Sequence, residues 1–516
     1  MAPLPSRRAR ALLWLTLIGI GFLTWVPLPA GVWNDDGVYL LIGKSLAEGQ
    51  GLRYAGIPGG VFAAKFPPVY PLLTALVWRL GPPFPESAVA LTALNVVLLA
   101  CAGVVLAIWL ARSGLVEGQR ASVVAFLALL PGPLWSVAAI PLSESLFLVL
   151  LLLGFVAAGP LERTGASWKG MLSFLLLFAL TVHTRSVGIA LAAALCGALL
   201  VRRAVRRSLG IAAGCLLVMV PWAVASGRMT SAMEPGLRDL LGSYGPWWVE
   251  QVRMAPDAYL TYLRNNAGSL GRDATALLLP GLEGAGARGL ALILWVAVGV
   301  GLLRVGRKSP TAGLFVLVYG LLVWAWPFQT ARLLVPAAPL LMAALLLGTG
   351  SLLRTARSGW RVALAAAALG VVVTSVGLHA YALGLRRPVR SLEQRAEVLA
   401  RALRSVAEHT PPEAVVGAPE LWPAIHLYTG RRAVPSARFL PLQQEWPSWG
   451  SPDQQLSLWR ATGVDHVLLE QGGAVHGETL NQLEARCPGT VTIVDRPEGM
   501  LLVRLDWAPA CGAPGS

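Results

Sequence analysis

Charged residues are scarce in this sequence, and so are the residues that bind metals. Only 13% of its 516 residues are charged, and it contains 5 cysteines and 6 histidines. No cysteines stand at the spacing of a zinc site, and no P-loop or dinucleotide-binding fingerprint is present. No short motif therefore indicates a nucleotide, dinucleotide or structural zinc site. Cys487 and Cys511 lie in the polar tail, where they can pair if that tail is in an oxidising compartment.

Long apolar segments are abundant. Hydrophobic residues make up 55% of the chain and the mean hydropathy is +0.62. The sequence holds about ten apolar runs of about 20 residues, whereas soluble globular proteins contain none. We therefore predict a polytopic α-helical membrane protein with room for one further folded domain.

The net charge of +15 comes largely from short basic clusters between the apolar segments. The clusters are Arg112–Arg120, Arg163–Lys169, Arg202–Arg207, Arg304–Lys308 and Arg354–Arg361. Cytoplasmic loops of membrane proteins carry such excess positive charge. We interpret the charge as a topology signal that also attracts anionic lipid, and not as a nucleic-acid-binding surface.

The apolar pattern predicts about 11 transmembrane helices. They are expected near 11–30, 88–110, 121–140, 143–160, 170–184, 187–201, 209–226, 287–304, 311–326, 333–351 and 362–384. The segment near 170–184 is short, so a re-entrant or tilted helix pair around Arg185 is an alternative. An odd number of spans gives a cytoplasmic N-terminus and an extracytoplasmic C-terminus. We predict a multi-pass protein of the inner (plasma) membrane.

Three segments are expected outside the membrane. Two are long outer loops, 31–87 and 227–288, within a transmembrane domain that covers 1–386. The third is the region 387–516, where an amphipathic helix over 391–409 precedes short β-like runs. The alternation of helical and β-like patterns predicts a small extracytoplasmic α/β domain.

Two adjacent acids, Asp35 and Asp36, follow the first apolar segment. Carboxylates are rare in this chain, so a pair at the membrane face suggests chemistry. The sequence Asn-Asp-Asp-Gly is also typical of a solvated turn with a helix N-cap. Both interpretations stay open at this point.

A lysine and several prolines follow the acids in the same loop. Lys65 begins the run Lys-Phe-Pro-Pro-Val-Tyr-Pro, in which Tyr70 also lies. A lysine near the membrane face can bind a lipid phosphate as a point charge. A snorkelling lysine beside a proline turn is the alternative.

Three further ionisable residues stand at predicted outer ends of apolar segments. Glu144 follows Pro141-Leu142-Ser143, and Arg185 and Arg332 run against the positive-inside bias. Arginine suits a bidentate grip on phosphate, and intramembrane acids are costly unless functional. The alternatives are a helix N-terminal acid for Glu144 and interfacial snorkelling for both arginines. Together with the acids and the lysine of the first outer loop, these three residues suit the transfer of a group from a lipid-phosphate donor.

With these residues in place, the chain resembles the GT-C glycosyltransferases, specifically the bacterial relatives of protein O-mannosyltransferases and of aminoarabinose lipid A transferases (families 39 and 83). The resemblance rests on the topology and on four motifs. These are Asp35-Asp36 with Tyr39, the Lys65–Pro71 stretch, the Arg332–Leu340 run, and Tyr428-Thr429-Gly430-Arg431 in the C-terminal domain. One residue, Phe66, separates the lysine from the proline pair, which departs from the family pattern.

The resemblance implies the GT-C fold and a polyprenyl-phosphate-linked sugar as donor. It implies an inverting transfer to a hydroxyl acceptor (lipid, glycan or protein) on the outer face, an activity of class EC 2.4. It implies that Asp35, with Asp36 as second choice, is the catalytic base or the residue that positions the acceptor, and that Lys65, Arg185 and Arg332 bind the donor phosphate. Tyr70 and Glu144 are further candidates for substrate binding. Use of a divalent metal varies in these families, and no ligand cluster here indicates one.

A polytopic transporter or lipid flippase without transferase activity is the competing hypothesis. Such proteins tend to carry internal repeats and charged or broken helices near the bilayer midplane. No repeat is visible in this sequence, and the candidate polar residues lie at span ends, which favours the enzyme. A catalytically inactive relative that acts as an assembly partner is a third possibility.

Overall fold

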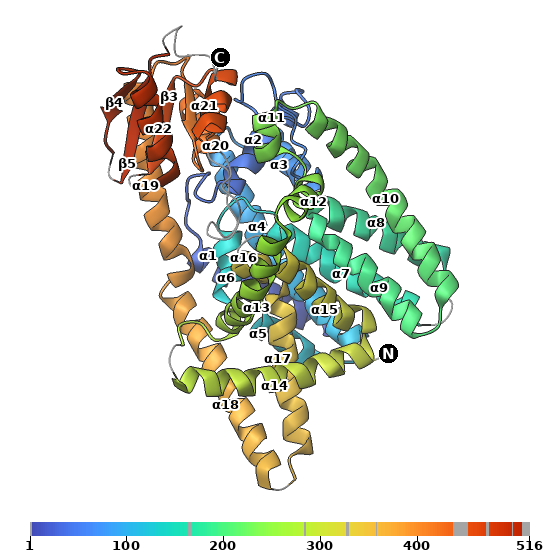
Figure 1. Cartoon of the computed structure of the whole chain (residues 1–516). Coiled ribbons are helices and arrows are strands. Elements are labelled where there is room, and N and C mark those ends of the chain that lie inside the picture. Colours follow the sequence, from blue (N-terminus) through green and yellow to red (C-terminus); the bar gives the residue numbers. More distant parts are fainter. Residues whose placement is uncertain are drawn as a thin grey trace. The chain divides into compact units, whose positions relative to one another are not determined.

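The computed structural model describes residues 3–163, 167–282, 285–326, 330–357, 359–436, 452–470, 474–497 and 499–507 (Figure 1). The chain divides into two compact units. Unit 1 comprises Met1–Val26, Thr92–Pro221 and Leu263–Arg390, and unit 2 comprises Pro27–Leu91, Trp222–Tyr262 and Ser391–Ser516. Each unit therefore gathers segments that are far apart in the sequence.

Unit 1 is built from helices. They are α1 (Arg7–Thr24), α4 (Glu86–Arg112), α5 (Gln119–Ala128), α6 (Gly132–Ala138), α7 (Glu144–Glu162), α8 (Trp168–Thr184), η1 (Ser186–Gly188), α9 (Ile189–Val201), α10 (Val205–Ser231), α13 (Pro256–Leu278), α14 (Ala285–Lys308), α15 (Pro310–Ala325), α16 (Thr330–Leu334), η2 (Val335–Ala337), α17 (Ala338–Thr355) and α18 (Gly359–Gly384). Helices α4, α10 and α13 continue into unit 2. Every segment predicted to cross the membrane coincides with one of these helices or with a broken helix.

The chain is a multi-pass membrane protein. Within the described residues, 6 helices are long and apolar enough to cross a bilayer, and the pair α5 and α6, bent by 75°, would make 7. The predicted number of 11 is therefore not confirmed. In the described part of unit 1, three further apolar helices, α8, α9 with η1, and α15, have 10–17 residues, and α1 begins with arginines.

Helices α14 and α17 approach each other closely because glycine lies at their contact. A Cβ atom on Gly301 would lie 1.8 Å from the Ala344 carbonyl oxygen, and one on Gly348 would lie 1.8 Å from that of Ala297. Small residues allow such backbone approach between membrane helices, where van der Waals packing replaces the hydrophobic effect. Figure 1 shows α14 crossing α17.

We expect Gly301→Ala to destabilise the protein by about 1–3 kcal/mol, because the methyl group meets backbone that cannot rotate away. Gly299 lies on the same helix, and a Cβ atom there would meet no heavy atom within 4 Å, so Gly299→Ala is the matched control. There the better helix propensity of alanine should leave stability unchanged or slightly raised. Thermal unfolding in detergent measures both variants, and equal unfolding temperatures would contradict the expectation.

Unit 2 combines outer-loop helices with an α/β domain. Its helices are α2 (Asp35–Ala47), α3 (Val69–Leu80), α11 (Pro235–Leu241), α12 (Tyr244–Met254), α19 (Arg387–His409), α20 (Trp422–Thr429), α21 (Pro452–Ala461) and α22 (Ala474–Arg486). Helix α19 begins four residues before the unit boundary. The first outer loop therefore belongs to the same compact unit as the C-terminal domain.

A five-stranded sheet forms the C-terminal domain, with α22 packed beside it (Figure 1). The strands are β1 (Val415–Ala418), β2 (Arg432–Pro435), β3 (His466–Glu470), β4 (Val491–Asp495) and β5 (Met500–Leu505), in the order β2-β1-β3-β5-β4. Strand β1 pairs in parallel with β2 and β3, and β5 pairs antiparallel with β3 and β4. The predicted small sheet is confirmed, but β2 was missed because it is short and ends in proline.

Three of the cysteines, Cys101, Cys196 and Cys215, are free. Cys511 lies outside the described residues. Its pairing with Cys487 therefore stays a prediction.

Candidate active site

Asp36 is fully buried and binds the backbone of the turn that precedes it. Its Oδ2 atom accepts hydrogen bonds from the N–H groups of Gly31 (2.7 Å) and Val32 (3.2 Å), and Oδ1 accepts one from Trp33 (2.9 Å). Burial raises the pKa of this carboxyl above its usual value, and the backbone N–H groups oppose the shift. Asp36, the second choice for the catalytic role, anchors this turn, and its part in catalysis stays a prediction.

Asp35 is the first residue of α2 and is only partly buried. Its negative charge acts on Lys65, which lies 30 positions later in the sequence, and on the buried Tyr54 hydroxyl. The fold thus separates the two adjacent acids. Asp36 accepts hydrogen bonds from the backbone turn, whereas Asp35 is near enough for its charge to act on Lys65 and retains contact with solvent.

Lys65 is held by the second outer loop. Its Nζ atom donates to the carbonyl oxygen of Leu240 (3.3 Å) and lies 4.7 Å from the ring centroid of Tyr244. Burial lowers the pKa of the Lys65 ammonium below its usual value, and the charge of Asp35 opposes that shift. Nearby, the Tyr54 hydroxyl donates to the carbonyl oxygen of Leu241 at 3.4 Å. Helices α11 and α12 therefore position the lysine of loop one.

Tyr70 lies in the core of this unit. Its side chain is fully buried, and its ring meets that of Tyr39 edge to face at a centroid distance of 4.7 Å. Tyr39 also packs edge to face on Phe66, at 5.1 Å. Tyr70 therefore packs α3 against α2, and the substrate binding predicted for it from the sequence stays a prediction.

The C-terminal domain braces the acidic turn through α20. The backbone N–H of Ala30 donates to the Tyr428 hydroxyl oxygen (2.8 Å), and the side-chain amide of Asn34 donates to the Glu420 carbonyl (2.7 Å). Gly31, at φ +94°, lies against Ala424, where a Cβ atom would come within 2.5 Å. Tyr428, part of the motif noted in the sequence, therefore positions the loop that carries Asp35.

Glu144, Arg185 and Arg332 come together in unit 1. The Oε1 atom of Glu144 lies 2.7 Å from Arg185 Nη1 and 2.9 Å from Arg332 Nε, and the acid is 2% exposed. Arg185 Nη1 also donates to the Ser143 hydroxyl at 3.2 Å. One carboxylate thus holds two guanidinium groups, which leaves the triad with a net charge of about +1.

Two buried polar residues that the sequence analysis missed support this triad. The amide of Asn95 donates to the carbonyls of Ile140 (2.9 Å) and Leu142 (3.2 Å), in the turn before α7. The Tyr319 hydroxyl donates to the Leu333 carbonyl (2.5 Å) in α16, the helix that carries Arg332. Each of the two is a polar side chain within an apolar span. A polar group in that position requires a hydrogen-bonding partner, so the sequence did carry a signal for both residues.

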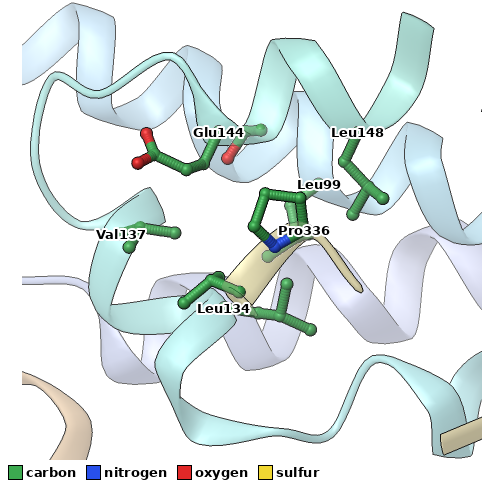
Figure 2. Close-up of a pocket in the computed structure, with 8 residues that line it drawn as sticks. Leu99, Leu134, Val137, Glu144, Leu148 and Pro336 are labelled. Carbon is green, nitrogen blue, oxygen red and sulfur yellow. The ribbon is translucent and has the colours of Figure 1, made fainter. Parts of the chain in front are cut away.

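The crevice beside Glu144 is apolar and has no room for a water molecule. Figure 2 shows Glu144 at its rim, with the carboxylate directed away from Leu148 and Pro336. The crevice is therefore a packing gap and not a substrate pocket. In the part of the chain that the structure describes, no group of three or more His, Cys, Asp or Glu residues could hold a metal ion.

Comparison with known proteins gives a match in structure alone. No protein-family model matches the sequence, and no curated protein does so. ArnT from Cupriavidus metallidurans, in a crystal structure bound to undecaprenyl phosphate, matches with a TM-score of 0.57 at 16% identity, over 98% of this chain and 99% of ArnT. The chain has the GT-C fold.

Two further structures agree with this fold. ArnT in the apo state matches with a TM-score of 0.53, at 16% identity over 98% of both chains. The oligosaccharyltransferase from Archaeoglobus fulgidus in the apo form matches with a TM-score of 0.50, at 11% identity over 93% of this chain and 70% of the other. The resemblance predicted from the outer-loop motifs is therefore confirmed as a likeness of fold.

Proposed function

We propose that this GT-C protein is a membrane glycosyltransferase. It moves a sugar from a polyprenyl-phosphate-linked donor to a hydroxyl acceptor on the outer face of the plasma membrane. The observation that carries this proposal is the partly exposed Asp35 carboxylate beside Lys65, which Leu240 and Tyr244 hold in place. The ArnT structure of the same fold contains undecaprenyl phosphate, which supports a lipid-phosphate donor.

The proposed reaction is a single displacement. Asp35 accepts the proton of the acceptor hydroxyl, whose oxygen forms a bond to the anomeric carbon of the sugar. The bond between that carbon and the phosphate oxygen breaks, and the polyprenyl phosphate leaves with the electron pair. The configuration at the anomeric carbon is therefore inverted. The ammonium of Lys65 stabilises the charge that develops on the leaving phosphate.

The Glu144 triad is proposed to contribute to donor binding. Two arginines with only one compensating acid attract an anion, and guanidinium groups match phosphate geometry. Glu144 then serves to orient Arg185 and Arg332 rather than to react. The topology proposed for the protein has 11 spans, a cytoplasmic N-terminus and an extracytoplasmic α/β domain.

A transfer assay with a labelled polyprenyl-phosphate sugar tests the function. Purified protein in detergent should consume the donor only when a hydroxyl acceptor is present, and should release polyprenyl phosphate with an inverted glycoside. Lipid, glycan and protein acceptors, each with hexosyl and pentosyl donors, would identify the substrate class. Movement of the labelled lipid across vesicles without any product would instead favour the flippase hypothesis.

The lowered pKa of Lys65 predicts a loss of activity at alkaline pH. If the protonated lysine binds the phosphate, kcat/KM should fall as the pH rises through that lowered pKa, below the range near 10.4 where an ordinary lysine titrates. In Lys65→Arg the guanidinium stays charged, so this alkaline loss should disappear. That holds whatever value kcat/KM takes at lower pH, where it does not change with pH. Lys65→Met should lose about 10²-fold in kcat/KM at all pH values.

Lys44 offers a matched control for that experiment. Its Nζ atom lies 3.4 Å from His426 Nε2, in the same unit but against a different partner. Lys44→Arg should keep the alkaline loss of the parent protein. An unchanged pH profile in Lys65→Arg would contradict the assignment of Lys65 to the phosphate.

A further inference from the structure

Helix α18 exposes an apolar face along most of its length. Exposed side chains on this helix include Val373 (64%), Tyr381 (56%) and Trp360 (70%). Such a face on a helix long and apolar enough to cross a bilayer is expected to contact lipid. α18 is therefore a peripheral helix of unit 1.

An aromatic ring pairs with an arginine at each end of this face. The guanidinium carbon of Arg361 lies 5.6 Å from the Trp360 ring centroid, and that of Arg387 lies 5.0 Å from the Tyr381 centroid. The two aromatic residues are 21 positions apart (381 − 360). At 1.5 Å per residue this is about 32 Å, close to the thickness of about 30 Å of a hydrocarbon core. The two pairs therefore mark the two membrane interfaces.

Exposed arginines lie at both of these interfaces. Arg354, Arg357 and Arg361 are exposed near the start of α18, and Arg386, Arg387 and Arg390 are exposed just after its end. One of the two clusters must lie on the outer side, whichever way the helix crosses. The positive-inside rule explains only the inner cluster. The orientation proposed above places Arg386–Arg390 outside, where the cluster needs another explanation.

Basic residues outnumber acids in the sequence around the outer cluster. No Asp or Glu occurs between Gly284 and Leu392, and the first acid after the three arginines is Glu393. The cluster also lies on a fixed turn. Arg386 has a φ of 52°, and the Ser136 hydroxyl in α6 donates to the Pro388 carbonyl at 2.6 Å. A basic patch on a fixed turn, next to a lipid-facing surface, has the chemistry of a headgroup site.

We propose that Arg387 and Arg390 bind the phosphate headgroup of an anionic phospholipid in the outer leaflet. The exposed apolar residues of α18, including Tyr381, together with Leu385 just beyond it, contact its acyl chains. This site is separate from the donor site proposed above and rests on that proposal only for the choice of leaflet.

Titration of the full chain in a neutral detergent tests the proposal. Fluorescently labelled phosphatidylglycerol is added, and the half-saturating concentration is measured for the parent protein and for Arg387→Gln/Arg390→Gln. Each arginine near an anionic surface contributes roughly fivefold in affinity, so the double variant should bind roughly 25-fold more weakly. Added salt should reduce the difference, because these charges are exposed.

Three comparisons make the result decisive. Arg404→Gln/Arg496→Gln removes the same charge from exposed positions of unit 2 and should bind like the parent protein. Arg387→Lys/Arg390→Lys keeps the charge and should bind within roughly threefold of the parent. Labelled phosphatidylcholine, whose headgroup carries no net charge, should bind far more weakly than phosphatidylglycerol.

Equal phosphatidylglycerol binding by the two Gln double variants would overturn the proposal, as would equal binding of phosphatidylcholine by the parent protein. If Arg387→Gln/Arg390→Gln unfolds, Arg390→Gln alone answers the same question, with an expected loss of roughly fivefold. Sugar transfer measured on the same variants separates this site from the donor site. Transfer should survive at saturating donor even where phospholipid binding is lost.

Discussion

Replacing Asp35 with Asn should lower kcat/KM for sugar transfer by about 10²–10⁴-fold, the usual contribution of a general base. The amide cannot accept the proton of the acceptor hydroxyl. Asp35 is partly exposed at the start of α2, so the variant should fold normally. The measurement is transfer from a labelled polyprenyl-phosphate sugar, together with the unfolding temperature of the same preparation.

Two matched variants show whether the loss belongs to Asp35 alone. Asp257→Asn changes an exposed acid in the first turn of α13 and should leave transfer unaffected. Asp36→Asn should lower stability by about 1–3 kcal/mol, because the new amide places a donor against backbone N–H groups that lose an acceptor. Near-normal transfer by Asp35→Asn, or a similar loss in Asp257→Asn, would rule out the proposed base.

Replacing Glu144 with Gln should lower the free energy of unfolding by about 3–5 kcal/mol, the usual cost of removing one partner of a buried ion pair. The substitution keeps the size of the side chain but removes the charge that holds Arg185 and Arg332. Two guanidinium groups then face each other across a neutral amide. Thermal or denaturant unfolding in detergent measures the change.

An exposed glutamate provides the control for this experiment. Glu86 lies in the first turn of α4 and is exposed, so Glu86→Gln should change stability by no more than about 0.5 kcal/mol. If Glu144→Gln were as stable as Glu86→Gln, the triad would not hold these helices together. Donor binding should also weaken in Glu144→Gln, since Arg185 and Arg332 lose their orientation.

The helices and the sheet of this protein were largely predictable from local sequence. Apolar runs coincide with helices because each run can satisfy its backbone hydrogen bonds within itself in lipid. Short β-like runs located four of the five strands, β1, β3, β4 and β5. The number of spans was less predictable, because α8, α9 and α15 are apolar but short and α5 and α6 are bent by 75°.

The sequence by itself determined a multi-pass helical membrane protein, the likeness to the GT-C fold, and a short list of ionisable residues. Hydropathy and residue type are local properties, so they need no knowledge of distant contacts. Only the tertiary structure decided which groups each ionisable residue contacts. Asp35 and Asp36 are neighbours in sequence, yet the backbone of Gly31–Trp33 donates hydrogen bonds to Asp36, whereas the charge of Asp35 acts on Lys65.

The Glu144 triad shows the same contrast between what the sequence determines and what the folded structure decides. Arg332 lies 188 positions from Glu144 in sequence, and their 2.9 Å contact exists only because α7 and α16 pack in one unit. The cost of burying a charge can be predicted from the residue type alone. The partner that offsets this cost depends on which helices pack together, and that is a property of the folded chain.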